Sequence, residues 1–184
     1  MRGARPVSCL LLLLATLAAS GAEPSAGLHP ALHGGLSVLA YPADGALRPS
    51  VGPALAGTVA WRGVSFGLES ALGGGGWRSE GIEVAVWRVE VWGQLGYARA
   101  LGPHLYFGVA GVFGGLWNHA RLRVAGAEGG GWRADLAYGA RLTAALFWGA
   151  PLGLSLELRG LVAGGRLGLG SALFLVWRPT GSAG

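Results

Sequence analysis

The chain has 184 residues, of which 52% are hydrophobic and 12% are charged, with 36 glycines, 8 tryptophans and a single cysteine. This composition excludes an intrinsically disordered chain, which would carry more charge and fewer aromatic residues, and the lone cysteine excludes a disulfide scaffold. The formal net charge of +5 comes from arginine, since the sequence contains no lysine, and we interpret it as a composition bias rather than as a nucleic-acid surface.

Residues 1–22 have the pattern of a secretory signal peptide. Two arginines precede an apolar run, and small residues follow it up to Ala22. The run is short for a transmembrane anchor, so we expect export and cleavage. Lipid attachment at Cys9 is not expected, because the apolar run continues after it. Residues 23–35 are expected to form a lead-in to the folded part.

From residue 36 onward, apolar side chains recur at every second position, which is the period of a β-strand. The clearest alternation spans 154–159, where three leucines alternate with a serine, a glutamate and an arginine. Eight strands are predicted in chain order: 36–41, 51–61, 64–69, 82–97, 105–117, 132–146, 154–159 and 167–177.

One predicted strand changes its apolar parity. Apolar residues occupy even positions from Ile82 to Val86 and odd positions from Val89 onward, with Trp87 and Arg88 at the switch. A single extra residue in one strand of a pair has this effect. The sequence therefore predicts a β-bulge at this point.

The face opposite the apolar one consists mainly of glycine, alanine and serine with a few opposed charges. A water-facing sheet would carry many more charged side chains, whereas a narrow membrane barrel is lined by small and polar ones. Eight strands leave an interior just wide enough for side chains to fill. We therefore expect an all-β fold, an eight-stranded antiparallel transmembrane β-barrel over residues 36–178, with a C-terminal tail at 179–184.

The connections alternate in length as they do in outer-membrane barrels whose ends both lie in the periplasm. Short inner connections are expected at 62–63, 99–103 and 148–152. The outer connections expected at 42–50, 73–81 and 118–131 are long, and the one at 163–166 is short. Tryptophans fall near strand ends, as in aromatic girdles: Trp61, Trp148 and Trp177 at the inner rim, and Trp77, Trp117 and Trp132 at the outer rim.

In this pattern the chain resembles the small eight-stranded outer-membrane proteins typified by the membrane domain of OmpA and by OmpX. The resemblance is architectural and covers the whole mature chain. Members of this group often end on a strand that closes with an aromatic residue. Here the segment Leu173-Phe174-Leu175-Val176-Trp177 has that form, although the chain continues to Gly184.

The histidines do not form a readable reactive site. His29 and His33 have the spacing of a shared helical face, but Pro30 and the following glycines argue against a helix, and His104 is interpreted as a rim residue. His119 lies at an outer strand end, where lipid A deacylase barrels keep a His and Ser pair, but no serine follows it nearby. We expect no catalytic residue, cofactor or metal.

Charged residues on the inward face would share one narrow lumen, and buried charges must pair. We expect a salt-bridge network that plugs the barrel, the alternative being that several of these groups face water at the rims. The expected members are Glu69, Glu83, Arg88, Glu90, Asp135, Arg141, Glu157 and Arg159.

A second set of arginines lies on the predicted outer connections. Arginine binds phosphate bidentately, and lipopolysaccharide head groups are phosphorylated in many outer membranes. We expect these residues to contact lipopolysaccharide, with ordinary solvated loop charge as the alternative: Arg48, Arg78, Arg121, Arg123 and Arg166.

The sequence thus predicts a monomeric outer-membrane protein of a Gram-negative bacterium, with a structural or surface-interaction role, no open pore and no nucleic-acid partner. A lipid-modifying barrel enzyme would need a serine, a histidine and an acid within reach at the outer rim, and a small-solute pore would need an unfilled lumen. A helical inner-membrane protein is the third alternative, because 101–120 is a stretch of 20 residues without formal charge. Pro103 and the lack of a second such span argue against it.

Overall fold

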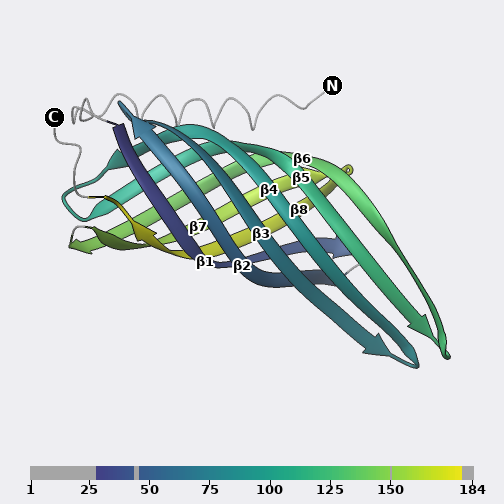
Figure 1. The fold of residues 1–184 in the computed structure, drawn as a ribbon. Coiled ribbons are helices and arrows are strands. Elements are labelled where there is room, and N and C mark those ends of the chain that lie inside the picture. Colours follow the sequence, from purple (N-terminus) through teal and green to yellow (C-terminus); the bar gives the residue numbers. More distant parts are fainter. Residues whose placement is uncertain (1–27, 44–45, 150, 180–184) are drawn as a thin grey trace, which may run out of the picture.

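The computed structural model describes residues 28–43, 46–149 and 151–179. Eight antiparallel strands pair in sequence order, and β1 also pairs with β8, so that the sheet closes into a barrel (Figure 1). The predicted all-β barrel is confirmed, and the expected signal peptide at 1–22 lies outside the described residues. The strands are β1 (Leu28–Ala43), β2 (Ala46–Trp61), β3 (Val64–Ser79), β4 (Ile82–Ala100), β5 (Leu105–Val124), β6 (Ala127–Gly149), β7 (Leu152–Ala163) and β8 (Arg166–Trp177).

The two faces of the strands have the chemistry that the alternation predicted. In β7 the leucines at 154, 156 and 158 are 40%, 49% and 53% exposed, whereas Ser155, Glu157 and Arg159 between them are at most 5% exposed. The leucine-rich face therefore points away from the barrel, and the small and charged face points into the lumen. This is the arrangement of a membrane barrel and the reverse of a soluble sandwich.

The first strand begins earlier than expected. β1 pairs with β2 from Leu28 opposite Trp61, so residues 28–35 belong to the barrel rather than to a lead-in. Gly34 and Gly35 hide the alternation in the sequence because they have no side chain on either face. The backbone still requires partners, since unpaired N–H and C=O groups are costly in a bilayer.

The connections at the two ends of the barrel differ from the expected loops. We call the end where β1 begins and β8 ends the terminal end, and the opposite end the distal end. At the distal end β3 and β4 join through Glu80 and Gly81, and β5 and β6 through Ala125 and Gly126, all four with positive φ. Two-residue turns of this kind match the twist of paired strands. The long loops expected at 73–81 and 118–131 are therefore wrong, because these segments continue as paired strand.

Four strands project beyond the barrel at the distal end. β2 pairs with β3 only as far as Gly74, and β7 pairs with β6 only as far as Ala137, while β3 to β6 stay paired with one another to their turns. We call these projecting parts, residues 75–79, 82–86, 115–124 and 127–136, the ribbon. Figure 1 shows its two hairpins curving away past the other strands.

The parity change in β4 is not a bulge. The register of β4 against β3 runs without a break from Ser79 opposite Ile82 to Val64 opposite Tyr97. Beyond the barrel the inward face becomes apolar, with Trp77 opposite Val84, and the outward face becomes charged, with Arg78 opposite Glu83. The apolar parity switches because the surroundings of each face change where the ribbon leaves the barrel.

The uncharged stretch 101–120 lies mainly in β5, so the helical reading of this segment is wrong. Its alternating Phe and Trp residues pair with β4 and β6 on either side. Across the described ranges, no helix is long and apolar enough to cross a bilayer.

Large apolar side chains share the lumen with the small and charged ones. One buried cluster includes Phe147, Phe174 and Val176, and a second includes Leu39, Trp92 and Leu116. The alternation predicted mainly small side chains inside, with a few opposed charges. A barrel of eight strands has a packed interior, and larger side chains fill the space that glycines and alanines leave.

Candidate functional site

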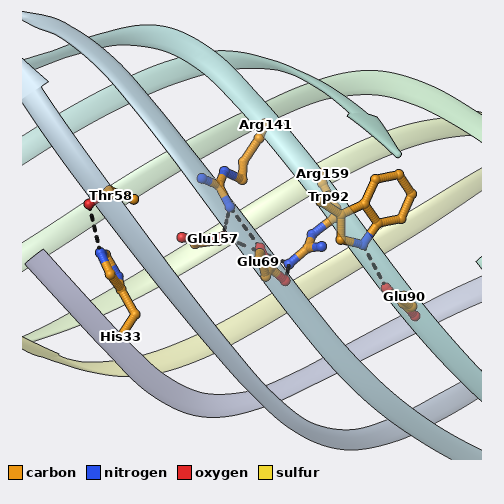
Figure 2. Close-up of polar contacts among 8 residues, drawn as sticks. All are labelled: His33, Thr58, Glu69, Glu90, Trp92, Arg141, Glu157 and Arg159. Atoms are coloured by element: carbon orange, nitrogen blue, oxygen red, sulfur yellow. Dashed lines mark hydrogen bonds and ion pairs between the residues drawn. The ribbon is translucent and has the colours of Figure 1, made fainter. Parts of the chain in front are cut away.

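Four charged side chains from three strands meet in the middle of the lumen (Figure 2). Arg141 Nη1 donates hydrogen bonds to Glu69 Oε2 at 2.9 Å and to Glu157 Oε2 at 2.7 Å. Arg159 Nη2 donates to Glu69 Oε1 at 2.6 Å and lies 3.8 Å from Glu157 Oε2. No side chain of the four is more than 4% exposed. We call Glu69, Arg141, Glu157 and Arg159 the lumen network.

The strand register explains why all four residues are needed. Arg141 of β6 lies directly opposite Arg159 of β7, a placement of like charges that is unfavourable by itself. Glu69 reaches them from β3 and bridges both guanidinium groups. Gly170 on β8 leaves room beside this site, because a Cβ there would stand 2.8 Å from Arg159 Cγ.

Other expected lumen residues lie nearer the distal end. Glu90 accepts a hydrogen bond from Trp92 Nε1 at 2.9 Å and lies 4.0 Å from Arg88, which donates to Asn118. Asp135 pairs with Arg133 at 2.8 Å. These contacts keep the charges of the distal lumen partnered.

Trp92 is the buried residue that sequence reasoning missed. It is 1% exposed, although it sits among the polar positions of β4. Its even parity, shared with Glu90 and Gln94, was the available signal that the ring points inward.

Glu83 lies outside the lumen. It sits on the outward face of the ribbon, where Arg78 donates a hydrogen bond to it at 2.9 Å. Arg78 thereby lowers the pKa of Glu83, mainly through the hydrogen bond and then through its charge. The sequence analysis placed Glu83 in the lumen because it assumed a bulge between Glu83 and Glu90.

The ribbon arginines gather on one face. Arg121 pairs closely with Glu128, and Arg123 lies 3.3 Å from Glu128 and 3.8 Å from Glu83. On this face, the three guanidinium groups of Arg78, Arg121 and Arg123 therefore pair with two carboxylates, those of Glu83 and Glu128. Of the other two expected members, Arg166 is exposed on the β7–β8 hairpin, and the side chain of Arg48 lies outside the described part of the structure.

Tryptophans mark both ends of the lipid-facing surface. At the terminal end, Trp61 is the last residue of β2, Trp177 is the last residue of β8, and Trp148 lies next to the end of β6. The three tryptophans are 43–59% exposed. Toward the distal end, Trp87 and Trp132 flank His119 across β4, β5 and β6, and the His119 ring lies 4.8 Å from that of Trp132. Trp77 is not part of this band, because it points to the inward face of the ribbon.

The comparisons with known proteins support the fold. A scan against protein-family models and a search of curated proteins each find no match. The chain is similar to the solved structure of Ail, the attachment invasion locus protein of Yersinia pestis, with a TM-score of 0.64 and 13% identity, over 83% of this chain and 99% of that chain. Ail in complex with the heparin analogue sucrose octasulfate matches with a TM-score of 0.62 and 14% identity, over the same shares.

Neisserial surface protein A matches with a TM-score of 0.59 and 6% identity, over 80% of this chain and 96% of that chain. At such identities the likeness shows the fold. The chain therefore has the fold of the small outer-membrane β-barrels, as its resemblance to OmpA and OmpX predicted.

Proposed function

We propose that this chain is a monomeric integral protein of a Gram-negative outer membrane that acts by surface interaction through its ribbon, and that it is neither a pore nor an enzyme. The observation that carries the proposal is the ribbon, whose four paired strands continue past the last pairing of β2 with β3 and of β7 with β6 at the distal end. The terminal end then faces the periplasm.

The outer surface of the barrel supports the membrane location. Leucines on successive strands are about half exposed on this surface, among them Leu36 at 59%, Leu55 at 67% and Leu173 at 49%. So wide an apolar surface is costly in water and suits hydrocarbon. Tryptophans near both ends fit the interfaces of a bilayer.

The filled lumen supports a role without conduction. The lumen network crosses the middle of the barrel, and the cluster around Trp92, Leu116 and Leu161 packs on its distal side with exposures of at most 1% for these three residues. An ion or small solute would have to displace paired charges and packed rings. We also propose that the barrel needs the complete lumen network, because removing one member would leave a buried charge without its partner.

The charged face of the ribbon supports lipopolysaccharide as the partner. Arg121 and Arg123 lie on the same face as Trp117 of β5, four and six residues beyond it along the strand, where phosphorylated head groups would lie. Ail, which shares the fold, has been solved with a polyanionic sugar analogue. Arg166, which is exposed on the β7–β8 hairpin, and Arg48, whose side chain lies outside the described structure, are the other proposed members.

Binding to immobilised lipopolysaccharide tests this contact. We expect the double variant Arg121→Gln/Arg123→Gln to bind roughly tenfold more weakly, and with less dependence on salt, because two exposed cationic contacts are lost. The variant Glu83→Gln/Glu128→Gln should bind more tightly, because it frees the same arginines from their internal partners. Arg62→Gln, an exposed arginine at the terminal end, is the matched control. Unchanged binding of both double variants would refute the contact.

A further inference from the structure

A cavity of about 350 Å³ occupies the lumen between the lumen network and the terminal end. Its volume falls in the range of small-ligand sites, roughly 300 to 1,000 Å³. All eight strands and the segment after β8 contribute to its wall. The cavity lies outside the ribbon and outside the proposed surface contact.

Much of the wall is apolar and aromatic. Phe147 and Val176 are 7% and 1% exposed and belong to the buried cluster on this side of the network, and Tyr106 packs against that cluster. The rings of Tyr106 and Phe147 meet edge to face, with centroids 5.3 Å apart. A ligand in this cavity therefore needs an apolar body.

Arg178 brings a cation to the same wall. Its guanidinium carbon lies 3.9 Å from the ring centroid of Tyr106 and 4.1 Å from that of Phe147. Its backbone N–H donates to the carbonyl of Pro151 at 2.8 Å, which holds the segment after β8 in place. Among the residues that the structure describes, no carboxylate lies within 4 Å of this guanidinium. Arginine stacked on rings keeps its planar N–H edge for a bidentate carboxylate.

Two buried polar atoms on the wall also lack partners. His33 Nε2 lies 3.1 Å from Thr58 Oγ1, as Figure 2 shows, while His33 Nδ1 has no hydrogen-bond partner within the described structure. Arg141 uses Nη1 for the lumen network, and its buried Nε has no partner within the same residues. Buried polar atoms are nearly always hydrogen-bonded in folded proteins. Both side chains line the cavity, so a polar ligand group could meet them.

The charge of the wall selects the ligand. The described lining includes the guanidinium groups of Arg141 and Arg178, and its one carboxylate, Glu157, already accepts a hydrogen bond from Arg141. A cationic ligand would be repelled. A sugar or another ligand that is polar all round would leave its groups unpaired against Phe147 and Val176.

We propose that this cavity binds a small organic monocarboxylate with an aromatic or short aliphatic body. The carboxylate pairs with Arg178, and the apolar body lies against Phe147, Tyr106 and Val176. The ligand enters from the terminal end, since the lumen network and the cluster beyond it close the other side. This site is independent of the ribbon, so either proposal can fail without the other.

Benzoate is a suitable probe, with benzamide as the neutral analogue of the same shape and benzylamine as the cationic one. The refolded full chain in a zwitterionic detergent is titrated by isothermal calorimetry, with empty micelles as the blank. We expect one benzoate site with a dissociation constant on the order of millimolar, as the size of the probe suggests. Benzamide should bind at least tenfold more weakly, and benzylamine should not bind.

Variants locate the site. Arg178→Gln should weaken benzoate binding at least tenfold, and Arg178→Lys should weaken it less, because the charge remains while the planar fork is lost. Arg62→Gln is the matched control, since Arg62 also lies over a ring at the terminal end, 5.0 Å from that of Trp61, but does not line the cavity. Unheated gel mobility verifies that each variant is folded.

A second variant keeps every charged side chain and reduces the volume of the cavity. Ala145→Leu adds apolar volume to the cavity wall and should abolish benzoate binding while Arg178 is retained. The proposal is overturned if the folded wild-type chain shows no saturable benzoate binding, if benzamide binds as well as benzoate, or if Arg178→Gln binds benzoate as the wild type does.

Discussion

Arg141 and Arg159 are neighbours across a strand pair, and they are stable there only because two glutamates neutralise them. A buried charge that loses its partner is strongly destabilising, whereas a complete pair contributes little net free energy. The lumen network therefore specifies which strands meet in the lumen more than it adds stability. Removing one member should cost more than removing a matched pair.

We predict that Arg141→Ala lowers the unfolding temperature in detergent. The substitution takes the Nη1 donor from both Glu69 and Glu157 and leaves Arg159 as their remaining partner in the network. The expected loss is about 3 kcal/mol, on the order of 10 °C. Circular dichroism during heating measures it, with Arg62→Ala as control. An unfolding temperature equal to that of the control would show that the network does not stabilise the barrel.

The double variant Arg141→Met/Glu157→Met should recover part of this loss. It removes one positive and one negative charge together and leaves Glu69 paired with Arg159. Buried ion pairs replaced by apolar side chains of similar volume are often neutral or stabilising. A double variant that unfolds below Arg141→Ala would show that packing, not charge balance, decides the site.

At the tip of the ribbon, the Arg78–Glu83 pair makes a pH-dependent contribution. The pKa of Glu83 is lowered from its ordinary 4.5 by the hydrogen bond from Arg78. A lowered pKa in the folded state means that the stabilisation is present above the ordinary value and is lost as the pH falls through the lowered one. We expect the protection factors of the amides at 78–83 to fall as the pH drops through the lowered pKa of Glu83. In Arg78→Gln the Glu83 pKa should return toward 4.5, as carboxyl chemical shifts would show; an unchanged pKa would contradict the pairing.

The ribbon is an element with two open edges. Beyond Gly74 and before Ala137, β3 and β6 lack the neighbours that β2 and β7 give them inside the barrel. Its turns include Ala125, a residue with a side chain at a φ of 47°, which costs roughly 1 kcal/mol relative to glycine. The ribbon should therefore open locally while the closed barrel does not.

Limited trypsin treatment of the folded protein in detergent should cut first in the ribbon. Arg121 and Arg123 are exposed beside the β5–β6 turn, whereas Arg141 and Arg159 are buried. The two fragments should remain associated and keep the mobility of a folded barrel on an unheated gel. Ala125→Gly should slow the cut by relieving the turn. First cleavage at Arg141 or Arg159 would mean that the barrel, not the ribbon, is the weaker element.

At the scale of the whole molecule, the even number of strands places the start of β1 and the end of β8 on one side of the membrane. The distal turns and the ribbon then lie on the other side. The one cysteine of the chain, Cys9, falls in the expected signal peptide, so that the mature chain offers a background free of thiols. Topology can be measured with single introduced cysteines.

We predict that Glu80→Cys reacts with a membrane-impermeant maleimide on intact cells. Arg62→Cys should react only after the outer membrane is permeabilised, because Arg62 lies in a turn at the terminal end. Both positions are exposed, which makes them a matched pair. The reverse pattern would overturn the orientation, and equal labelling of both before permeabilisation would overturn the membrane location.

The sequence by itself determined the barrel, its eight strands and the side of each strand that meets lipid, because a period of two in side-chain polarity is a local property of the chain. It also predicted that Glu69, Arg141, Glu157 and Arg159 lie on the inward face, since odd and even positions of a strand point to opposite faces. Only the tertiary structure decided which of these residues touch, because contact across the lumen depends on the stagger between strands far apart in sequence.

The same limit explains the errors. Gly34 and Gly35 of β1 and the glycine-rich edges of the ribbon carry no polarity signal, so the earlier strand start and the projecting strands did not show in the sequence. Arg178 and the cavity beside it depend on where the segment after β8 meets β5 and β6, a long-range packing that no local pattern encodes. Local alternation sets the faces of a barrel, and strand stagger sets its contacts.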